Sequence, residues 1–188
     1  MIPSSIILPQ EDLSFSIISL DSNWQIQGML LTSLLCGPQI GTICAISYLI
    51  IGIFYLPVFH GGGSVGYILT HEFGYLLGFV PAAWTCGFLA KKSRKVNLIN
   101  YSFYTVSSLF VLHIIGITYL VFGKLFGNWT DSLSDLILIN TLIPFPNQLL
   151  LCLTISLISI GLKYILIQKW LKIRIKKQKY YCIHFTLF

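Results

Sequence analysis

Long uncharged apolar runs, separated by short polar or glycine-rich segments, dominate the chain. Three of these runs contain no charged residue, and a fourth carries only Lys163 near its end. Each is close to the roughly 20 residues that an α-helix needs to cross about 30 Å of hydrocarbon. The pattern predicts four membrane-spanning helices, at residues 40–59, 73–90, 101–122 and 149–167.

A fifth apolar run, residues 26–36, is shorter and ends at Gly37 and Pro38. Trp24 and Gln25 precede it and suit a membrane interface, where amphipathic aromatic side chains gather. The run is therefore predicted to be a short fifth span.

The chain between the third and fourth long runs is too interrupted to cross a membrane. Its apolar stretch at residues 136–143 is predicted to lie along the outer surface as an amphipathic helix. Pro144 and Pro146 then end this helix and start the last span. The predicted fold class is all-α: a polytopic membrane helix bundle of about five transmembrane helices plus an outer-surface amphipathic helix.

The few charged residues are sorted by sign between the two ends of the apolar runs. Apart from Lys124, every Lys and Arg lies in residues 91–95 or after residue 160. The acidic residues lie at the opposite ends of the runs; they are Glu11, Asp12, Asp21, Glu72, Asp131 and Asp135. Because basic loops are retained on the cytoplasmic side, we expect the N-terminus outside and the C-terminus inside.

The composition agrees with a membrane protein. Hydrophobic residues make up 55% of the chain and charged residues 10%, against about 25% charged in a soluble domain. The net charge is +6, and the basic residues that produce it lie next to the predicted spans. Contact with anionic lipid headgroups explains them more simply than binding to a nucleic acid, so no nucleic acid partner is expected. The 5 cysteines form no CxxC and are interpreted as free thiols, so no metal and no cofactor are predicted.

Two segments at the predicted outer surface have chemistry suited to a small ligand. His60 precedes the glycines at positions 61–63, whose backbone can fold over a ligand, although a plain connecting turn explains them equally well. Asn147 and Gln148 offer two amides at the broken start of the last span, where discontinuous backbone is tolerated if it lines a cavity.

Aromatic residues would wall such an outward-facing pocket; they are Tyr67, Tyr75, Trp84 and Trp129. The pocket suits a small, mostly apolar, hydrogen-bonding molecule. The residues predicted to bind it are His60, Gly62, Gly63, Tyr75 and Gln148.

Other candidate sites are weaker. His71 and Glu72 do not start a zinc HExxH motif, because Tyr75 stands where its second histidine would be. His113 lies mid-span, where an ionisable residue is a functional candidate, but a neutral imidazole bonded to a neighbouring helix is favoured because no span carries a carboxylate. Asp131 and Asp135 lie one helical turn apart and either cap the surface helix or form a catalytic dyad.

Several blocks of sequence resemble the BioY family, the biotin-binding S components of energy-coupling-factor (ECF) transporters. The blocks lie in residues 34–41, at Tyr48 and Gly52, in residues 56–63 and 74–79, and at Gly87. Residues 144–151 also look like the Pro-Phe-x-Pro-Gly-Asp block of the family's last helix. The resemblance implies a six-helix protein, here lacking its first helix, that captures biotin near the outer face beneath its loops.

The chain departs from the family pattern at three places. The first helix, which faces the coupling subunit in the family, has no counterpart. Asn147 and Gln148 replace the family's Gly-Asp, and Leu151 replaces a lysine one turn later. His71 and Glu72 replace family residues before Gly74. A carboxylate suits the ureido N–H groups of biotin and a cation its valerate, whereas Gln148 can bond a ureido ring in both directions.

The resemblance implies a membrane subunit, not an enzyme, that binds biotin or a similar vitamin outside. A membrane coupling subunit and an ATPase pair would drive delivery, because the chain has no Walker A sequence. The alternatives are an intramembrane hydrolase using Asp131 and Asp135, or a non-transporting membrane assembly protein. The expected location is a bacterial plasma membrane or a plastid membrane, with a cytoplasmic or stromal C-terminus. The predicted divisions are an extracytoplasmic segment (1–23), a transmembrane substrate-binding domain (24–168) and a basic tail (169–188).

Overall fold

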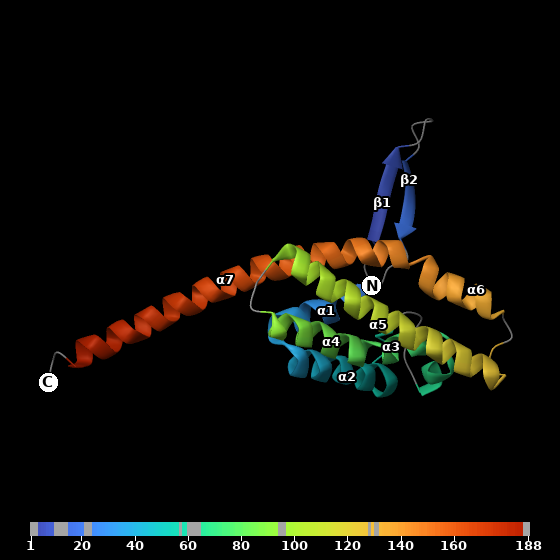
Figure 1. Cartoon of the computed structure of the whole chain (residues 1–188), viewed down its shortest axis with the longest axis horizontal. Helices are drawn as coiled ribbons and strands as arrows, with labels where there is room; N and C mark the ends of the chain where they lie inside the picture. The colour runs from blue at the N-terminus through green and yellow to red at the C-terminus, as the bar shows by residue number, and fades with distance from the viewer. Residues whose placement is uncertain are drawn as a thin grey trace.

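The structure is a computed structural model that describes residues 4–9, 15–20, 24–56, 58–59, 65–93, 97–127, 129 and 132–185, with side chains between residues 24 and 166. A helix or a pair of helices occurs at each of the five predicted spans, which confirms the predicted helical membrane bundle (Figure 1). In chain order the elements are β1 (Ser4–Pro9), β2 (Phe15–Leu20), α1 (Trp24–Cys36), α2 (Pro38–Phe54), the 3-10 helix η1 (Val65–Leu69), α3 (Phe73–Leu77), α4 (Phe79–Lys92), α5 (Leu98–Leu125), α6 (Leu133–Ile137), the π-helix η2 (Leu138–Leu142) and α7 (Phe145–Phe185).

Before α1 the chain forms a two-stranded antiparallel hairpin, which sequence analysis did not anticipate. Ser4 pairs with Leu20 at one end of the ladder and Pro9 with Phe15 at the other. Each strand has 6 residues, an ordinary length for a strand and far below the roughly 20 that a spanning helix needs. Figure 1 shows the hairpin projecting from the helical bundle beside the start of α7.

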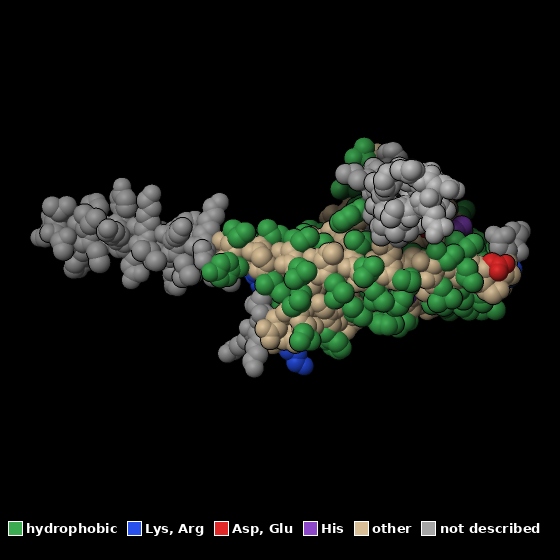
Figure 2. All heavy atoms as spheres, turned by 90° about the horizontal axis from the view of Figure 1, so that it is seen from above, with side chains coloured by type: hydrophobic (Ala, Val, Ile, Leu, Met, Phe, Trp, Pro, Cys, Tyr) green, Lys and Arg blue, Asp and Glu red, His purple; other side chains and the backbone are tan. Residues whose placement is uncertain are grey.

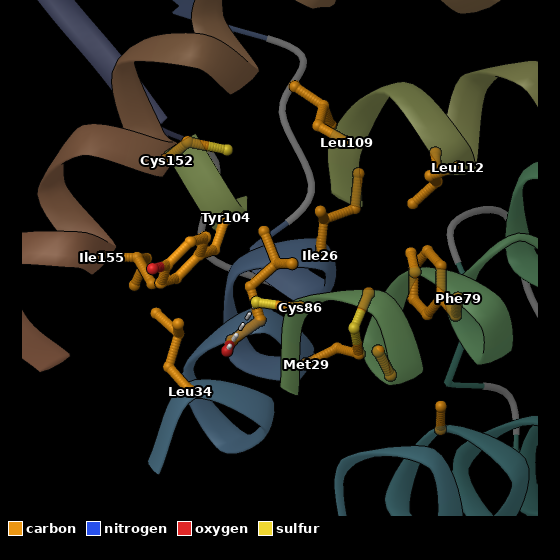
Figure 3. Close-up of a cluster of buried hydrophobic side chains, with 14 of the residues drawn as sticks. Ile26, Met29, Leu34, Phe79, Cys86, Tyr104, Leu109, Leu112, Cys152 and Ile155 are labelled. Carbon is orange, nitrogen blue, oxygen red and sulfur yellow. Dashed lines mark hydrogen bonds between the residues drawn. The ribbon is translucent and has the colours of Figure 1, made fainter. Parts of the chain in front are cut away.

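The core of the bundle lies around α1, which packs against α2, α4 and α7, while α5 packs against α4 and α7. Figure 3 shows side chains from these helices converging, among them Ile26 of α1, Cys86 of α4 and Ile155 of α7. The Cys86 thiol contacts the carbonyl oxygen of Leu30 at 4.0 Å. A single apolar interior therefore joins helices that are distant in the sequence.

Glycine makes one tight turn and one close approach in this core. Gly37 has a φ of 87°, in the left-handed region that side chains disfavour, and it makes the tight turn from α1 into α2. Gly87 of α4 faces the backbone of that turn: a Cβ placed on it would lie 2.4 Å from the nitrogen of Pro38. Small residues at such positions let helix backbones approach closely.

Several predicted boundaries needed correction. The second span was expected to reach residue 59, but α2 ends at Phe54, because Pro57 disfavours helical geometry in the residue before it. The third span is divided at Gly78 into α3 and α4. The last helix was expected over residues 149–167, but α7 already begins at Phe145 and continues through the basic tail.

The lengths of the helices fit a membrane. Among the described residues, three helical segments are long and apolar enough to cross one by length and composition: Phe73–Lys92, Leu98–Leu125 and Leu133–Leu166. Pro38–Phe54 is a shorter apolar helix. The 41 residues of α7 correspond to about 60 Å, roughly twice the hydrocarbon thickness.

The exterior of the bundle is apolar between its two ends. Figure 2 shows apolar side chains covering its flank, with acidic atoms at the end where α6 lies and lysine atoms at the opposite end. We call the end that carries Asp135 and the α6 helix the acidic end. The opposite end carries exposed Lys91 and Lys92 at the close of α4. This separation is the one that the sequence pattern predicted.

Candidate functional site

A buried hydrogen bond joins α5 to α7 near the start of α7. His113 is 4% exposed, and its Nε2 lies 2.9 Å from Oε1 of Gln148. Because an amide oxygen only accepts, this arrangement assigns the proton to Nε2. The interpretation of His113 as an imidazole bonded to a neighbouring helix is therefore confirmed. Its other nitrogen, Nδ1, is buried without a partner among the described residues.

Two aromatic rings pack against the His113 imidazole. The ring of Tyr75 meets it edge-on at a centroid distance of 5.8 Å, and the ring of Phe145 at 5.4 Å. The hydroxyl of Tyr75 is also hydrogen-bonded to Oγ1 of Thr141 at 2.6 Å. We call His113, Gln148, Tyr75, Thr141 and Phe145 the His113 cluster.

The Tyr75 ring can occupy this place only because Gly116 of α5 has no side chain. A Cβ at Gly116 would lie 2.4 Å from the Tyr75 ring. Gly116 follows His113 on the same helix by three residues, and residues at that spacing lie on one helix face. The face of α5 that carries the imidazole therefore also positions the tyrosine.

The structure brings together two of the five predicted binding residues. Tyr75 and Gln148 both contact His113, while His60, Gly62 and Gly63 lie outside the described residues. Sequence reasoning noticed His113 as an intramembrane ionisable residue but did not place it in the site. Thr141 was missed, and a threonine in an apolar stretch gives no signal that could have identified it.

A second group of aromatic rings lies where α2, η1 and α4 meet. Phe59 contacts Tyr48 edge-on at 5.5 Å and Tyr67 at 5.0 Å, and Tyr48 stacks on Phe79 at 6.0 Å. Gly52 makes room for the Phe59 ring, which a Cβ there would approach to 2.1 Å. These four rings form a wall between the end of α2 and the start of α4.

Two hydrogen bonds hold the chain just before the glycine segment. The carbonyl oxygen of Val58 accepts from Nε2 of Gln25 at 2.9 Å and from the hydroxyl of Tyr48 at 3.0 Å. Gln25 lies in the first turn of α1, so the start of α1 is tied to the root of the loop.

One carboxylate contacts the aromatic wall. The hydroxyl of Tyr67 donates to Oε2 of Glu72 at 2.5 Å. Burial, and then the hydrogen bond to Glu72, raise the pKa of Tyr67, so the phenol stays protonated and remains a donor. Glu72 precedes α3, and a carboxylate is favoured at the start of a helix.

Two other predicted wall residues have different outcomes. Trp84 is 49% exposed and stacks on Phe88, itself 44% exposed. Its prediction as a pocket wall was wrong, because it lies on the outside of α4. Trp129 packs beside Tyr119 at 6.2 Å and edge-on to His71 at 6.2 Å, so it covers the acidic end of the bundle.

The surface helix that was predicted from residues 136–143 is present as α6 and η2. It starts earlier, at a cap in which Oγ of Ser132 accepts from the backbone N–H of Asp135 at 3.2 Å. The Ser132 hydroxyl also donates to Oδ2 of Asp135 at 2.6 Å. Ser132 is therefore the N-cap, whereas the sequence had offered this role to the aspartates, and Asp135 lies in the first turn of the helix, where a negative charge is favoured. Asp131 lies outside the described residues.

These features define a class of protein: a membrane helix bundle with a buried aromatic and hydrogen-bonding cluster between α5, α3 and the start of α7. Comparisons with known proteins identify the family. The profile of the BioY family matches residues 13–168. The chain belongs to the BioY family, whose members are membrane transport subunits and not enzymes.

Individual relatives agree with this assignment. An "Uncharacterized 21.2 kDa protein in psbX-ycf33 intergenic region" of Cyanophora paradoxa is 30% identical over 145 residues, covering 77% of this chain and 74% of the relative. A "Probable biotin transporter BioY" of Lysinibacillus sphaericus is 30% identical over 96 residues, covering 51% of this chain and 49% of the relative.

A solved structure shares the fold. It is described as the S-component for biotin from an ECF-type ABC transporter, and it superposes with a TM-score of 0.64. The match covers 79% of this chain and 76% of that one at 22% sequence identity. The predicted S-component fold is therefore confirmed.

Proposed function

We propose that this chain is the substrate-binding subunit of a biotin uptake transporter and that biotin binds at the acidic end of the bundle. The observation that carries the proposal is the buried His113–Gln148 hydrogen bond, flanked by the Tyr75 ring. Polar groups are costly inside a membrane protein and usually serve a function there. Family membership and the names of two similar proteins support biotin as the ligand.

The chemistry of the site suits the ureido ring of biotin. The Gln148 amide offers both an acceptor and donors, as a cyclic urea does. The rings of Tyr75 and Phe145 provide apolar faces for the bicyclic ring system. We place His60, Gly62 and Gly63, on the loop that follows Val58, over the bound ligand, and the valerate beneath that loop.

Binding of labelled biotin to the purified full-length protein tests this function. We expect saturable binding that unlabelled biotin displaces. Phe88→Leu is a matched control, because Phe88 lies on the outside of α4 and its loss should leave the affinity unchanged. The absence of saturable binding below about millimolar, the weak end of useful affinity, would remove the biotin assignment.

We further propose that a membrane coupling subunit and an ATPase pair drive delivery inward. Residues 169–188 are then a basic tail on the inner side, and residues 1–23 an extracytoplasmic segment. The membrane is a bacterial plasma membrane or a plastid membrane. Uptake of labelled biotin into cells that lack their own biotin transporter should require co-expression of such a coupling module; equal uptake without it would contradict the coupling.

The orientation has its own test. We propose that the acidic end faces outward, because translocating the lysines at the other end costs about 2.5–3.5 kcal/mol each on insertion scales. A membrane-impermeant maleimide should label Ser134→Cys in intact cells, and Lys92→Cys only after permeabilisation, with the unmodified protein as the blank. The reverse pattern would invert the topology and place the binding site inside.

A further inference from the structure

The side chain of Gln27 in α1 is buried, and none of the described residues forms a hydrogen bond with it. It is 1% exposed, and neither Nε2 nor Oε1 has a partner among the described residues. Its helix neighbours Ile26 and Leu30 belong to the apolar core. A buried amide that lacks partners is unfavourable, and the interior of a membrane protein offers little water to satisfy it. A molecule that enters the bundle can supply the missing partners.

Gln27 lies close to the root of the proposed binding loop. Gln25, two residues earlier on α1, donates to the carbonyl oxygen of Val58, and Tyr48 donates to the same oxygen. Val58 directly precedes the segment with the glycines. One helical residue advances about 1.5 Å along the axis, so Gln27 lies less than one turn along α1 from Gln25, on a different face of the helix.

The register of the helices places Gln27 at the level of Gln148. α1 packs against α7, and Figure 3 shows Leu34 of α1 pointing up toward Ile155 of α7 within one buried cluster. Gln27 lies seven residues before Leu34, and Gln148 lies seven residues before Ile155. Both helices run away from the acidic end, and a spacing of seven returns to the same helix face after two turns.

His113 connects this level to α5. Its Nε2 lies 2.9 Å from Oε1 of Gln148, the residue of α7 that the register sets level with Gln27. Gln27, His113 and Gln148 are thus three buried polar side chains on three helices of the bundle, and Gln148 is the residue that relates the other two.

We propose that Gln27 is a ligand-contacting residue that determines specificity for a cyclic urea; this inference rests on the proposed function. Gln148 Oε1 is engaged by His113, whereas neither polar atom of Gln27 has a partner within the part of the chain that the structure describes. The carbonyl of Gln27 accepts one ureido N–H, and its amide N–H donates to the ureido oxygen. An N–H and a C=O lie side by side in a cyclic urea, so the two hydrogen bonds form as a pair.

Gln27→Met tests the inference in the full-length protein, because methionine keeps the length of the side chain and removes both polar atoms. We expect the Kd for biotin to rise at least tenfold. The ligand-free protein should unfold at the same or a higher temperature, because the substitution removes an amide that had no partner. Desthiobiotin, which retains the cyclic urea, should lose affinity by a similar factor.

Gln25→Met is the matched control on the same helix. It removes a hydrogen bond that the structure contains, so it should lower the unfolding temperature of the ligand-free protein. An unchanged Kd in Gln27→Met would overturn the inference whatever happens to the unfolding temperature. A higher unfolding temperature would then mean that the amide had bound only water, and a lower one would mean that the amide has a structural role. Absence of biotin binding by the unmodified protein would overturn the inference and the proposed function together.

Discussion

Gln148→Leu is expected to weaken biotin binding by about 100-fold or more. The substitution removes the amide that we propose binds the ureido ring, and it leaves the Nε2–H of His113 without its acceptor. Each buried polar group left without a partner costs about 1–3 kcal/mol, and every 1.4 kcal/mol is tenfold in affinity. Equilibrium binding of labelled biotin measures the loss. The ligand-free variant should also lose about 1–3 kcal/mol of stability.

A double variant separates the structural role from the binding role. Replacing both partners of a buried hydrogen bond by apolar groups is far less costly than replacing one. His113→Leu combined with Gln148→Leu should therefore recover most of the unfolding temperature that Gln148→Leu loses. Binding should remain weak, because the amide is still absent. If the double variant regains affinity together with stability, Gln148 acts on binding only through the fold.

The helices could be predicted from the sequence because uncharged runs of spanning length have few alternatives in a membrane. The ends of helices were predicted less well. The apolar run of the last span was placed at residues 149–167, with Pro144 and Pro146 expected to end the surface helix and start that span, and α7 begins between these prolines, at Phe145. Proline is accepted in the first turn of a helix, where its missing N–H has no intrahelical partner to lose. A proline can therefore mark either the end of one helix or the first turn of the next.

The rotation of each helix about its axis could not be predicted. Trp84 and Phe88 lie four residues apart and share one face of α4, yet that face is exposed. In a soluble protein the polar face of a helix shows which side is exposed. A spanning helix is apolar all round, so Trp84 was placed in the wall of a pocket although it lies on the outside.

The parts of the site that could not be predicted from the sequence are contacts between segments that lie far apart in the chain. Gln148 was proposed from the broken start of α7, but its partner His113 lies on another helix. Tyr75 bonds Thr141, which is 66 positions away in the chain. Such pairs depend on how α5 and α7, and α3 and η2, lie against each other, and nothing local in the sequence matches one residue to its partner. The composition predicts that a polar residue in a span needs a partner, but not which one.

Gly87→Ala is expected to have the largest effect on stability of any single methyl group added to the core. A Cβ at Gly87 would lie 2.4 Å from the nitrogen of Pro38 and 2.6 Å from the carbonyl carbon of Gly37. Backbone atoms cannot rotate away as a side chain can, so α4 must move from the turn between α1 and α2. Overpacking of a core costs about 1–3 kcal/mol, occasionally more, and we expect the upper part of this range. Thermal unfolding of the purified protein measures it.

Gly28→Ala is the matched control, because nothing lies within 4 Å of a Cβ at that position. Alanine is favoured over glycine in a helix interior by about 1 kcal/mol, so this variant should be as stable as the unmodified protein or more so. The two glycines thus predict opposite signs for the same chemical change. Equal unfolding temperatures for both variants would show that α4 does not pack against the Gly37–Pro38 turn as closely as the structure has it. The placement of the proposed site would then be in question. The contact between Gly87 and the Gly37–Pro38 turn sets how α4, which carries Phe79, packs against α1, which carries Gln25 and Gln27.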